Sequence, residues 1–191
     1  LRVGTNNLLT NTIQMGSPEY YSTTNGGWIK ANETYRLYSK NLAIWKLAKQ
    51  GATIKYNPLN SAKVVSLQPN ASYTMSFYAK SDSPAKVNYS LPYTIGGITA
   101  HSEGYSNGWT LTNEWKRYWI KFTTNNRKVS PFEFQLTGVG DAHTKGVVTS
   151  AWQLEESHIL SDWHPSDNDL EENIAEYKRT IDQNLSRLQT T

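Results

Sequence analysis

The chain has 191 residues, 37% of them hydrophobic and 12% aromatic, and its formal net charge at pH 7 is +3. No apolar run approaches the roughly 18 residues that span a bilayer, and no signal-peptide pattern opens the chain, so we expect no membrane insertion. The absence of cysteine excludes disulfides and cysteine-based zinc sites, and the dispersed basic residues do not indicate nucleic-acid binding.

The chain begins with Leu1 rather than Met, so we expect it to be a piece of a longer polypeptide. Stretches rich in β-branched and aromatic residues then recur about every ten residues, separated by turn-forming clusters such as "QPNA" and "SDSP". They predict strands at 8–13, 52–57, 62–67, 72–81, 86–93, 116–124, 132–138 and 147–156. Because no helical periodicity intervenes, the pattern predicts an antiparallel β-sandwich or barrel. The segments 14–40 and 94–108 are predicted loops.

A change of pattern after Pro165 marks a boundary between two parts of the chain. Residues 1–166 carry 16 Lys and Arg against 10 Asp and Glu, whereas residues 167–191 carry 3 against 6. Ser166 or Asp167 can cap a helix that begins there. Apolar residues then follow a heptad pattern, with Ile174, Ile181 and Leu188 at one seam position and Leu170, Tyr177 and Asn184 at the other. We expect an all-β body, 1–166, and a helix, 167–191, that starts a coiled coil or, alternatively, folds back on the body.

The stretch "EWKRYWIKFTTN", residues 114–125, carries an aromatic ring on what is predicted to be an outward face. Alternation places Tyr118 with the apolar core positions and places Trp119 on the other face, between Arg117 and Lys121. A pyranose ring has an apolar face of C–H groups and an edge of hydroxyls, so an exposed aromatic ring flanked by hydrogen-bond donors suits a sugar. The alternative is that Trp119 packs under a loop or against the helix.

Other side chains are candidates for the same carbohydrate site. If the strand registers hold, Tyr78, Gln135 and Gln153 are hydroxyl-binding partners on neighbouring strands. The predicted loops contribute Trp28 and Tyr105, and Trp109 lies just beyond the second loop. With Arg117 and Trp119 these residues form the candidate site, although each aromatic ring taken alone can instead cover the core.

The order of four motifs, "NLLTNT", "YTMSFYAKSD", "NEWKRYWIKFTT" and "AWQLEESHILSDWHPS", resembles the jelly-roll carbohydrate-binding modules of phage tail, baseplate and host-adhesion proteins of Gram-positive bacteria. The resemblance covers most of residues 6–166, and it departs at "EESHILSDW", where that family often has a Gly before the final turn. It implies a galactose-binding-like jelly roll of two antiparallel sheets, located on the virion and extracellular at the host surface. The large Tyr177 and the polar Asn184 at the seam favour a parallel homotrimer, and the resemblance supports it, with other phage tail proteins as further partners.

The chain has no recognisable set of catalytic residues. A glycosidase needs two carboxyl groups at a defined separation, and the side chains of the adjacent pairs Glu155–Glu156 and Glu171–Glu172 diverge. The histidines form no zinc pattern, and a nucleophile-elbow motif is absent. We therefore expect a binding protein that is not an enzyme and requires no cofactor. In jelly rolls of this kind a structural Ca²⁺ is common, and oxygens of Asn6, Glu19, Asp141 or Glu155 are its candidate ligands.

Two functions stay open. The preferred one is a non-catalytic carbohydrate-binding module of a phage tail or baseplate protein that adheres to a host cell-surface polysaccharide. The alternative is a structural or protein-interaction jelly roll, a spacer in a trimeric tail fibre whose aromatic face contacts another subunit.

Overall fold

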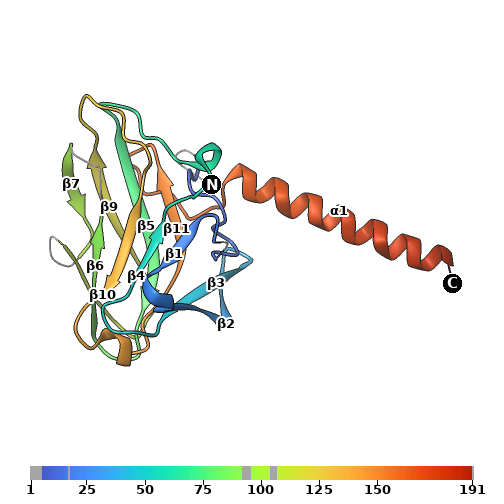
Figure 1. Ribbon diagram of the computed structural model, residues 1–191, viewed down its shortest axis with the longest axis horizontal. Helices are drawn as coiled ribbons and strands as arrows, with labels where there is room; N and C mark the ends of the chain where they lie inside the picture. The colour runs from blue at the N-terminus through green and yellow to red at the C-terminus, as the bar shows by residue number, and fades with distance from the viewer. Residues whose placement is uncertain (1–5, 17, 92–95, 104–106, 191) are drawn as a thin grey trace.

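The computed structural model describes residues 6–16, 18–91, 96–103 and 107–190. Two antiparallel sheets pack face to face, and a helix, α1 (Asp167–Thr190), projects away from the side of the sandwich (Figure 1). The predicted all-β antiparallel sandwich with a C-terminal helix is therefore confirmed. Within the described residues, no helix is both long enough and apolar enough to cross a bilayer.

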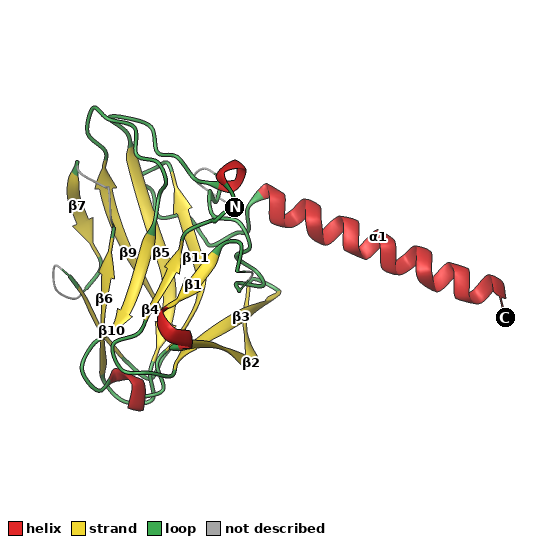
Figure 2. Cartoon of the chain, in the orientation of Figure 1, coloured by secondary structure: helices red, strands yellow, loops and turns green. Residues whose placement is uncertain are grey.

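The two sheets, drawn in yellow in Figure 2, contain strands from distant parts of the chain. In the five-stranded sheet the order is β1 (Tyr21–Thr23), β4 (Thr53–Tyr56), β10 (Phe134–Gly138), β6 (Ala85–Ser90) and β8 (Gly108–Leu111). In the six-stranded sheet it is β2 (Trp28–Leu37), β3 (Lys40–Leu47), β11 (Val148–Glu155), β5 (Ser72–Lys80), β9 (Lys116–Thr123) and β7 (Gly97–His101). Short 3₁₀ helices lie in the connections, at η1 (Thr24–Gly26), η2 (Ser61–Lys63) and η3 (Ala142–Thr144).

The core lies between the sheets and follows the alternation of the central strands. On β5 and β9 the buried residues are Tyr73, Met75, Phe77, Tyr118, Ile120 and Phe122, with Met75 paired to Ile120. Burial of these apolar side chains is the main driving force for the sandwich. The residues between them point the other way, to what we call the outer face of the six-stranded sheet. The predicted in-and-out register of 116–124 is confirmed.

Some predicted strands and loops were wrong. Segments 14–40 and 94–108, predicted as loops, contain β1, β2 and β7. Strand β2 was not predicted because it is an edge strand that exposes polar residues on both sides, so its sequence shows no alternation. Segments 8–13 and 62–67, predicted as strands, belong to none of the strands, and the second begins inside η2. Each holds a fully buried leucine, Leu9 and Leu67, which packs in the core without belonging to a strand.

Two tyrosines of the core provide a matched test of this packing. Tyr21 and Tyr56 meet edge to face with ring centroids 5.2 Å apart. The hydroxyl of Tyr56 accepts a hydrogen bond from the backbone N–H of Thr10 at 3.1 Å, whereas the buried hydroxyl of Tyr21 has no partner among the described residues. Burial raises the pKa of Tyr21 well above its usual value.

We expect Tyr21→Phe to stabilise the protein by about 1 kcal/mol, because it removes a buried polar group that makes no hydrogen bond. Tyr56→Phe should destabilise it by about 1 kcal/mol, because the N–H of Thr10 loses its acceptor. Urea unfolding of the two variants measures both changes. A larger loss of stability in Tyr21→Phe than in Tyr56→Phe would contradict the hydrogen-bond assignment.

Helix α1 is fixed to the body at its first turn. The hydroxyl of Ser166 accepts a hydrogen bond from the backbone N–H of Asp169 at 3.1 Å and caps the helix. The buried carboxylate of Asp169 accepts hydrogen bonds from the backbone N–H groups of Asn11 and Thr12, at 2.7 and 3.0 Å, and from the Thr12 hydroxyl at 2.7 Å. The apolar side chains from Ile174 onward are exposed, so the fold-back alternative is wrong.

Candidate functional site

Part of the outer face is covered by residues 157–164, which we call the strap. The carbonyl of Ser157 accepts a hydrogen bond from the Thr74 hydroxyl on β5 at 2.6 Å, and Trp163 donates its indole N–H to the carbonyl of Trp152 at 3.1 Å. Gln153 is locked beneath the strap, because its side-chain oxygen accepts the backbone N–H of His164 at 2.9 Å. With 1% of its surface exposed, Gln153 does not line an open site, and that part of the prediction was wrong.

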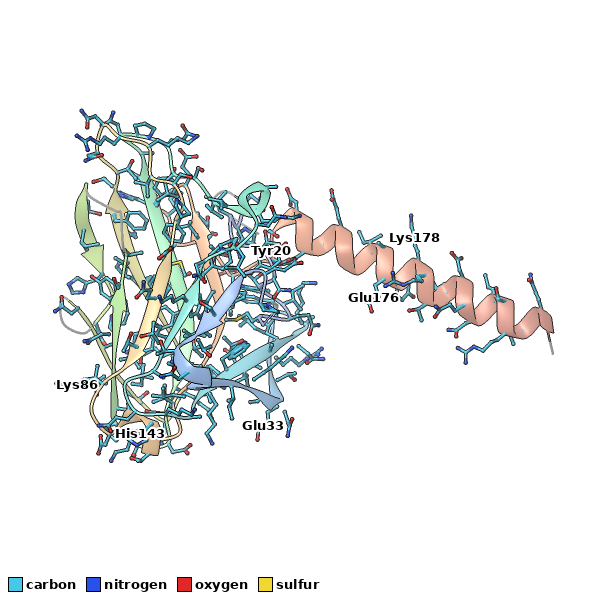
Figure 3. All side chains as sticks on the ribbon, in the orientation of Figure 1. Tyr20, Glu33, Lys86, His143, Glu176 and Lys178 are labelled. Carbon is cyan, nitrogen blue, oxygen red and sulfur yellow. The ribbon has the colours of Figure 1, made fainter. Side chains whose placement is uncertain are left out.

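Another part of the outer face, towards β2 and β3, forms an open groove of about 460 Å³. Its floor is a row of paired residues that crosses four adjacent strands. Ile29 on β2 pairs with Lys46 on β3. Val148 on β11 then pairs with Lys46 on one side and with Lys80 on β5 on the other. Glu33, labelled in Figure 3, lines the groove on the β2 side. The floor is thus partly apolar, and polar and charged groups surround it.

An aromatic pair stands beside this floor. Trp115, directly before β9, also lines the groove, and its ring stacks on that of Tyr35 from β2 with centroids 4.2 Å apart and an interplanar angle of 20°. The ring of Tyr35 is in turn 5.6 Å from that of Tyr78 on β5. Both Trp115 and Tyr35 are half-buried, so each keeps some exposed ring surface. A partly exposed ring that is held in place by another ring suits the apolar face of a sugar.

Tyr78 and Arg117 lie beside each other on the same face. The guanidinium of Arg117 is 5.8 Å from the centre of the Tyr78 ring and donates a hydrogen bond to the Ser76 hydroxyl at 3.0 Å. Burial raises the pKa of Tyr78 to about 12. Burial also lowers the pKa of Arg117. Neither Tyr78 nor Arg117 is among the residues that line the groove.

Trp119 is on the outer face, as the alternation predicts, but it does not line the groove. It is half-buried, with the ammonium of Lys121 5.1 Å from its ring centre. Four residues of extended chain separate it from Trp115, a distance of roughly 13 Å. A sugar contact at Trp119 stays a prediction, separate from the groove.

Three other candidates are not part of an open site on this face. Trp28 is 1% exposed and donates its indole N–H to the carbonyl of Ala52 at 2.9 Å, and Trp109 is fully buried in the core. Gln135 is on β10, in the five-stranded sheet, and therefore does not share the outer face of the six-stranded sheet. These placements contradict the predicted shared site, whereas Tyr105 lies outside the described residues. The tryptophans belong to β2 and β8, where large apolar rings fill the core.

The sequence reasoning missed Trp115 and Tyr35. Trp115 is two residues before Arg117 and four before Trp119, so it falls on the same face as they do in an extended strand. Extending the predicted strand 116–124 by one residue towards the N-terminus would have placed Trp115 on the outer face. Tyr35 could not be found in this way, because its segment was predicted to be a loop.

Two of the four candidate Ca²⁺ ligands are engaged by protein groups. The carboxylate of Glu155 accepts hydrogen bonds from the side chains of Gln153, at 2.5 Å, and Ser161, and that of Asp141 is 3.8 Å from the ammonium of Lys145. Across the described ranges, no group of three or more His, Asp or Glu side chains is placed to hold a metal ion.

Comparison with known proteins identifies the family. The sequence profile described as "Carbohydrate binding domain" matches residues 25–142, more than half of the chain, and the chain belongs to this family. The matched range contains every strand of the groove except β11. A search of curated proteins finds no match.

Solved structures show the same fold. The chain is similar to the CBM22-1 xylan-binding domain of Paenibacillus barcinonensis Xyn10C, with 13% identity, coverage of 82% of this chain and 98% of that chain, and a TM-score of 0.51. It is also similar to the CBM22-1 and GH10 modules of a Clostridium thermocellum endo-1,4-β-D-xylanase complexed with xylohexaose, with 11% identity, coverage of 83% and 29%, and a TM-score of 0.50. At such identities the similarity shows the fold alone.

Proposed function

We propose that this protein is a non-catalytic carbohydrate-binding module of a phage tail or baseplate protein, and that it adheres to a polysaccharide on the host cell surface. The observation that carries the saccharide site is the stacked pair of Trp115 and Tyr35 beside an open groove with a partly apolar floor. Membership of the carbohydrate binding domain family supports saccharide binding. The order of the four sequence motifs supports the phage setting.

Each part of the groove has a role in this proposal. Trp115 stacks on the apolar face of a pyranose ring, and Tyr35 holds the indole in place. The exposed side chain of Asn32, which lines the groove, supplies a donor and an acceptor for the hydroxyl edge. Binding by stacking and hydrogen bonds needs no metal ion, so chelators should leave it unchanged.

Titration of the intrinsic tryptophan fluorescence with a panel of bacterial polysaccharides, in the presence of EDTA, tests the proposal. We expect a saturable response in the high-micromolar to millimolar range, roughly 4–6 kcal/mol, because a shallow polar site must displace well-bonded water. The alternative, a structural spacer in a tail fibre, predicts no saturable response to any member of the panel.

We further propose that α1 joins two other copies of the chain in a parallel three-stranded coiled coil. The apolar side chains Ile174, Tyr177, Ile181 and Leu185 are between 41% and 70% exposed, so α1 presents an apolar stripe to solvent. A large Tyr177 and a polar Asn184 at seam positions fit a three-stranded interior. Three copies would present three weak grooves together and gain adhesion by avidity.

The double variant Ile174→Ser, Ile181→Ser should convert the trimer to a monomer, because it removes two seam side chains. The matched control is Ala175→Ser, Asp182→Ser, one residue further along the helix, and it should remain trimeric. Sedimentation equilibrium measures the mass of each. A wild-type chain that stays monomeric at high concentration, or a trimer that persists in the seam variant, would overturn the proposal.

A further inference from the structure

The groove contains two ammonium groups that form no ion pair with the acidic side chains that the structure describes. Lys46 on β3 and Lys80 on β5 both line the groove and flank Val148 in the same row. Two strand spacings separate their backbones, a distance of roughly 10 Å. Among the described residues neither lysine has an ion-pair partner, whereas Lys116 is 2.7 Å from Glu103 and Lys145 is 3.8 Å from Asp141.

The position of Lys80 ties this charge to the aromatic pair. Its ammonium is 5.8 Å from the centre of the Trp115 ring. A sugar stacked on Trp115 would therefore bring the substituents on its edge close to a cation. Lys46, on the far side of Val148, would meet a neighbouring unit of the same polysaccharide.

The acidic residues of the groove lie outside the row of Lys46, Val148 and Lys80. Glu33 is exposed on β2, within the stretch where the pairing of β2 with β3 shifts register. Asp82 lies beyond the end of β5, and its carboxylate rests on Gly146, where an added Cβ would be 2.1 Å from Oδ2. Lys30 adds a third cation to the lining, so cations exceed anions in the groove.

We propose that the polysaccharide recognised by this groove is anionic, with carboxylate or phosphate groups spaced along its chain that pair with Lys46 and Lys80. The inference rests on the proposed function of the groove as the saccharide site and names its substrate class. A neutral glycan would need hydroxyl-binding groups here, and hydrated ammonium groups on flexible stems are less suited to that task than amides or hydroxyls.

Four polymers test the proposal on the full chain. Polygalacturonate and its methyl ester share one backbone and differ in charge, a glycosylated glycerol-phosphate teichoic acid carries both sugar rings and phosphate, and unsubstituted xylan is neutral. Affinity is measured by fluorescence titration at low and at high ionic strength. We expect at least one anionic polymer to bind about tenfold or more tightly than the ester and xylan, with the difference reduced by salt. The polymer that binds distinguishes carboxylate from phosphate.

The double variant Lys46→Gln, Lys80→Gln should lower affinity for the anionic polymer about tenfold, because two partly exposed ion pairs are lost. The matched control is Lys55→Gln on β4, in the other sheet, which should bind like the wild type. If the ester and xylan bind as tightly as the anionic polymers, or if the double variant behaves like Lys55→Gln, the inference is wrong while the proposed saccharide site stands. If no polysaccharide binds at all, the proposed function itself fails.

Discussion

Trp115→Ala should weaken saccharide binding by about 2 kcal/mol, or roughly thirtyfold, while the protein stays folded. Trp115 is half-buried at the groove, and its main ring contact is with Tyr35 rather than with the core. Truncation removes the stacking surface and leaves the space between the sheets unchanged. Fluorescence titration loses part of its signal in this variant, so isothermal titration calorimetry measures the affinity and a thermal melt checks the fold.

Trp119→Ala is the matched control for this prediction. It removes the same kind of ring from β9, four residues further along the chain and roughly 13 Å from Trp115. We expect saccharide binding in the groove to be unaffected. If Trp119→Ala abolished binding and Trp115→Ala did not, the saccharide would lie on Trp119, and the assignment of the groove would be wrong.

Trp109→Ala should destabilise the protein by about 3–5 kcal/mol, because it leaves a large cavity in the core. The fully buried indole packs against Phe77, Tyr89 and Tyr118, with ring centroids 5.2, 5.2 and 5.5 Å away. A loss of this size is a large share of the 5–15 kcal/mol by which domains are usually stable. Urea unfolding measures it, with Trp115→Ala as the tryptophan control that should keep its midpoint.

The two tryptophan variants also separate a core role from a ligand role. Any loss of binding in Trp109→Ala should match the fraction of unfolded protein, and binding should recover on cooling towards conditions where the variant is folded. If Trp109→Ala were folded but had no affinity for the saccharide, that result would support the ligand contact predicted from the sequence for this residue.

The sequence predicts well those parts of the fold in which local pattern and tertiary burial agree. In β5 and β9 one face is core and the other is not, so Tyr118 and Trp119 could be assigned to opposite faces from alternation alone. The helix of residues 167–190 has a cap and a period that are both local features. For these elements no knowledge of distant residues is needed.

The groove could not be predicted, because it depends on contacts between segments far apart in the chain. Tyr35 meets Trp115 although β3, β11 and β5 lie between β2 and β9 in the sheet, and β2 shows no strand pattern of its own. Gln153 was correctly expected on the outer face, but its access is blocked by a strap whose path no periodicity reveals. Trp28 and Trp109 follow glycines in predicted loops, and only the tertiary fold shows that they are core.

The way α1 joins the body determines how the protein responds to mechanical tension. A pull on the helix first loads the hydrogen bonds from Asn11 and Thr12 to Asp169, and then those that hold the strap. Only after these does it reach β11, which has β3 on one side and β5 on the other. Because β11 is not an edge strand, bonds on both flanks must break for it to leave, and this raises the barrier that sets the rate of forced unfolding. If the groove holds a polysaccharide and α1 holds a neighbouring chain, as proposed above, tension between the two is transmitted through this central strand rather than through an edge strand.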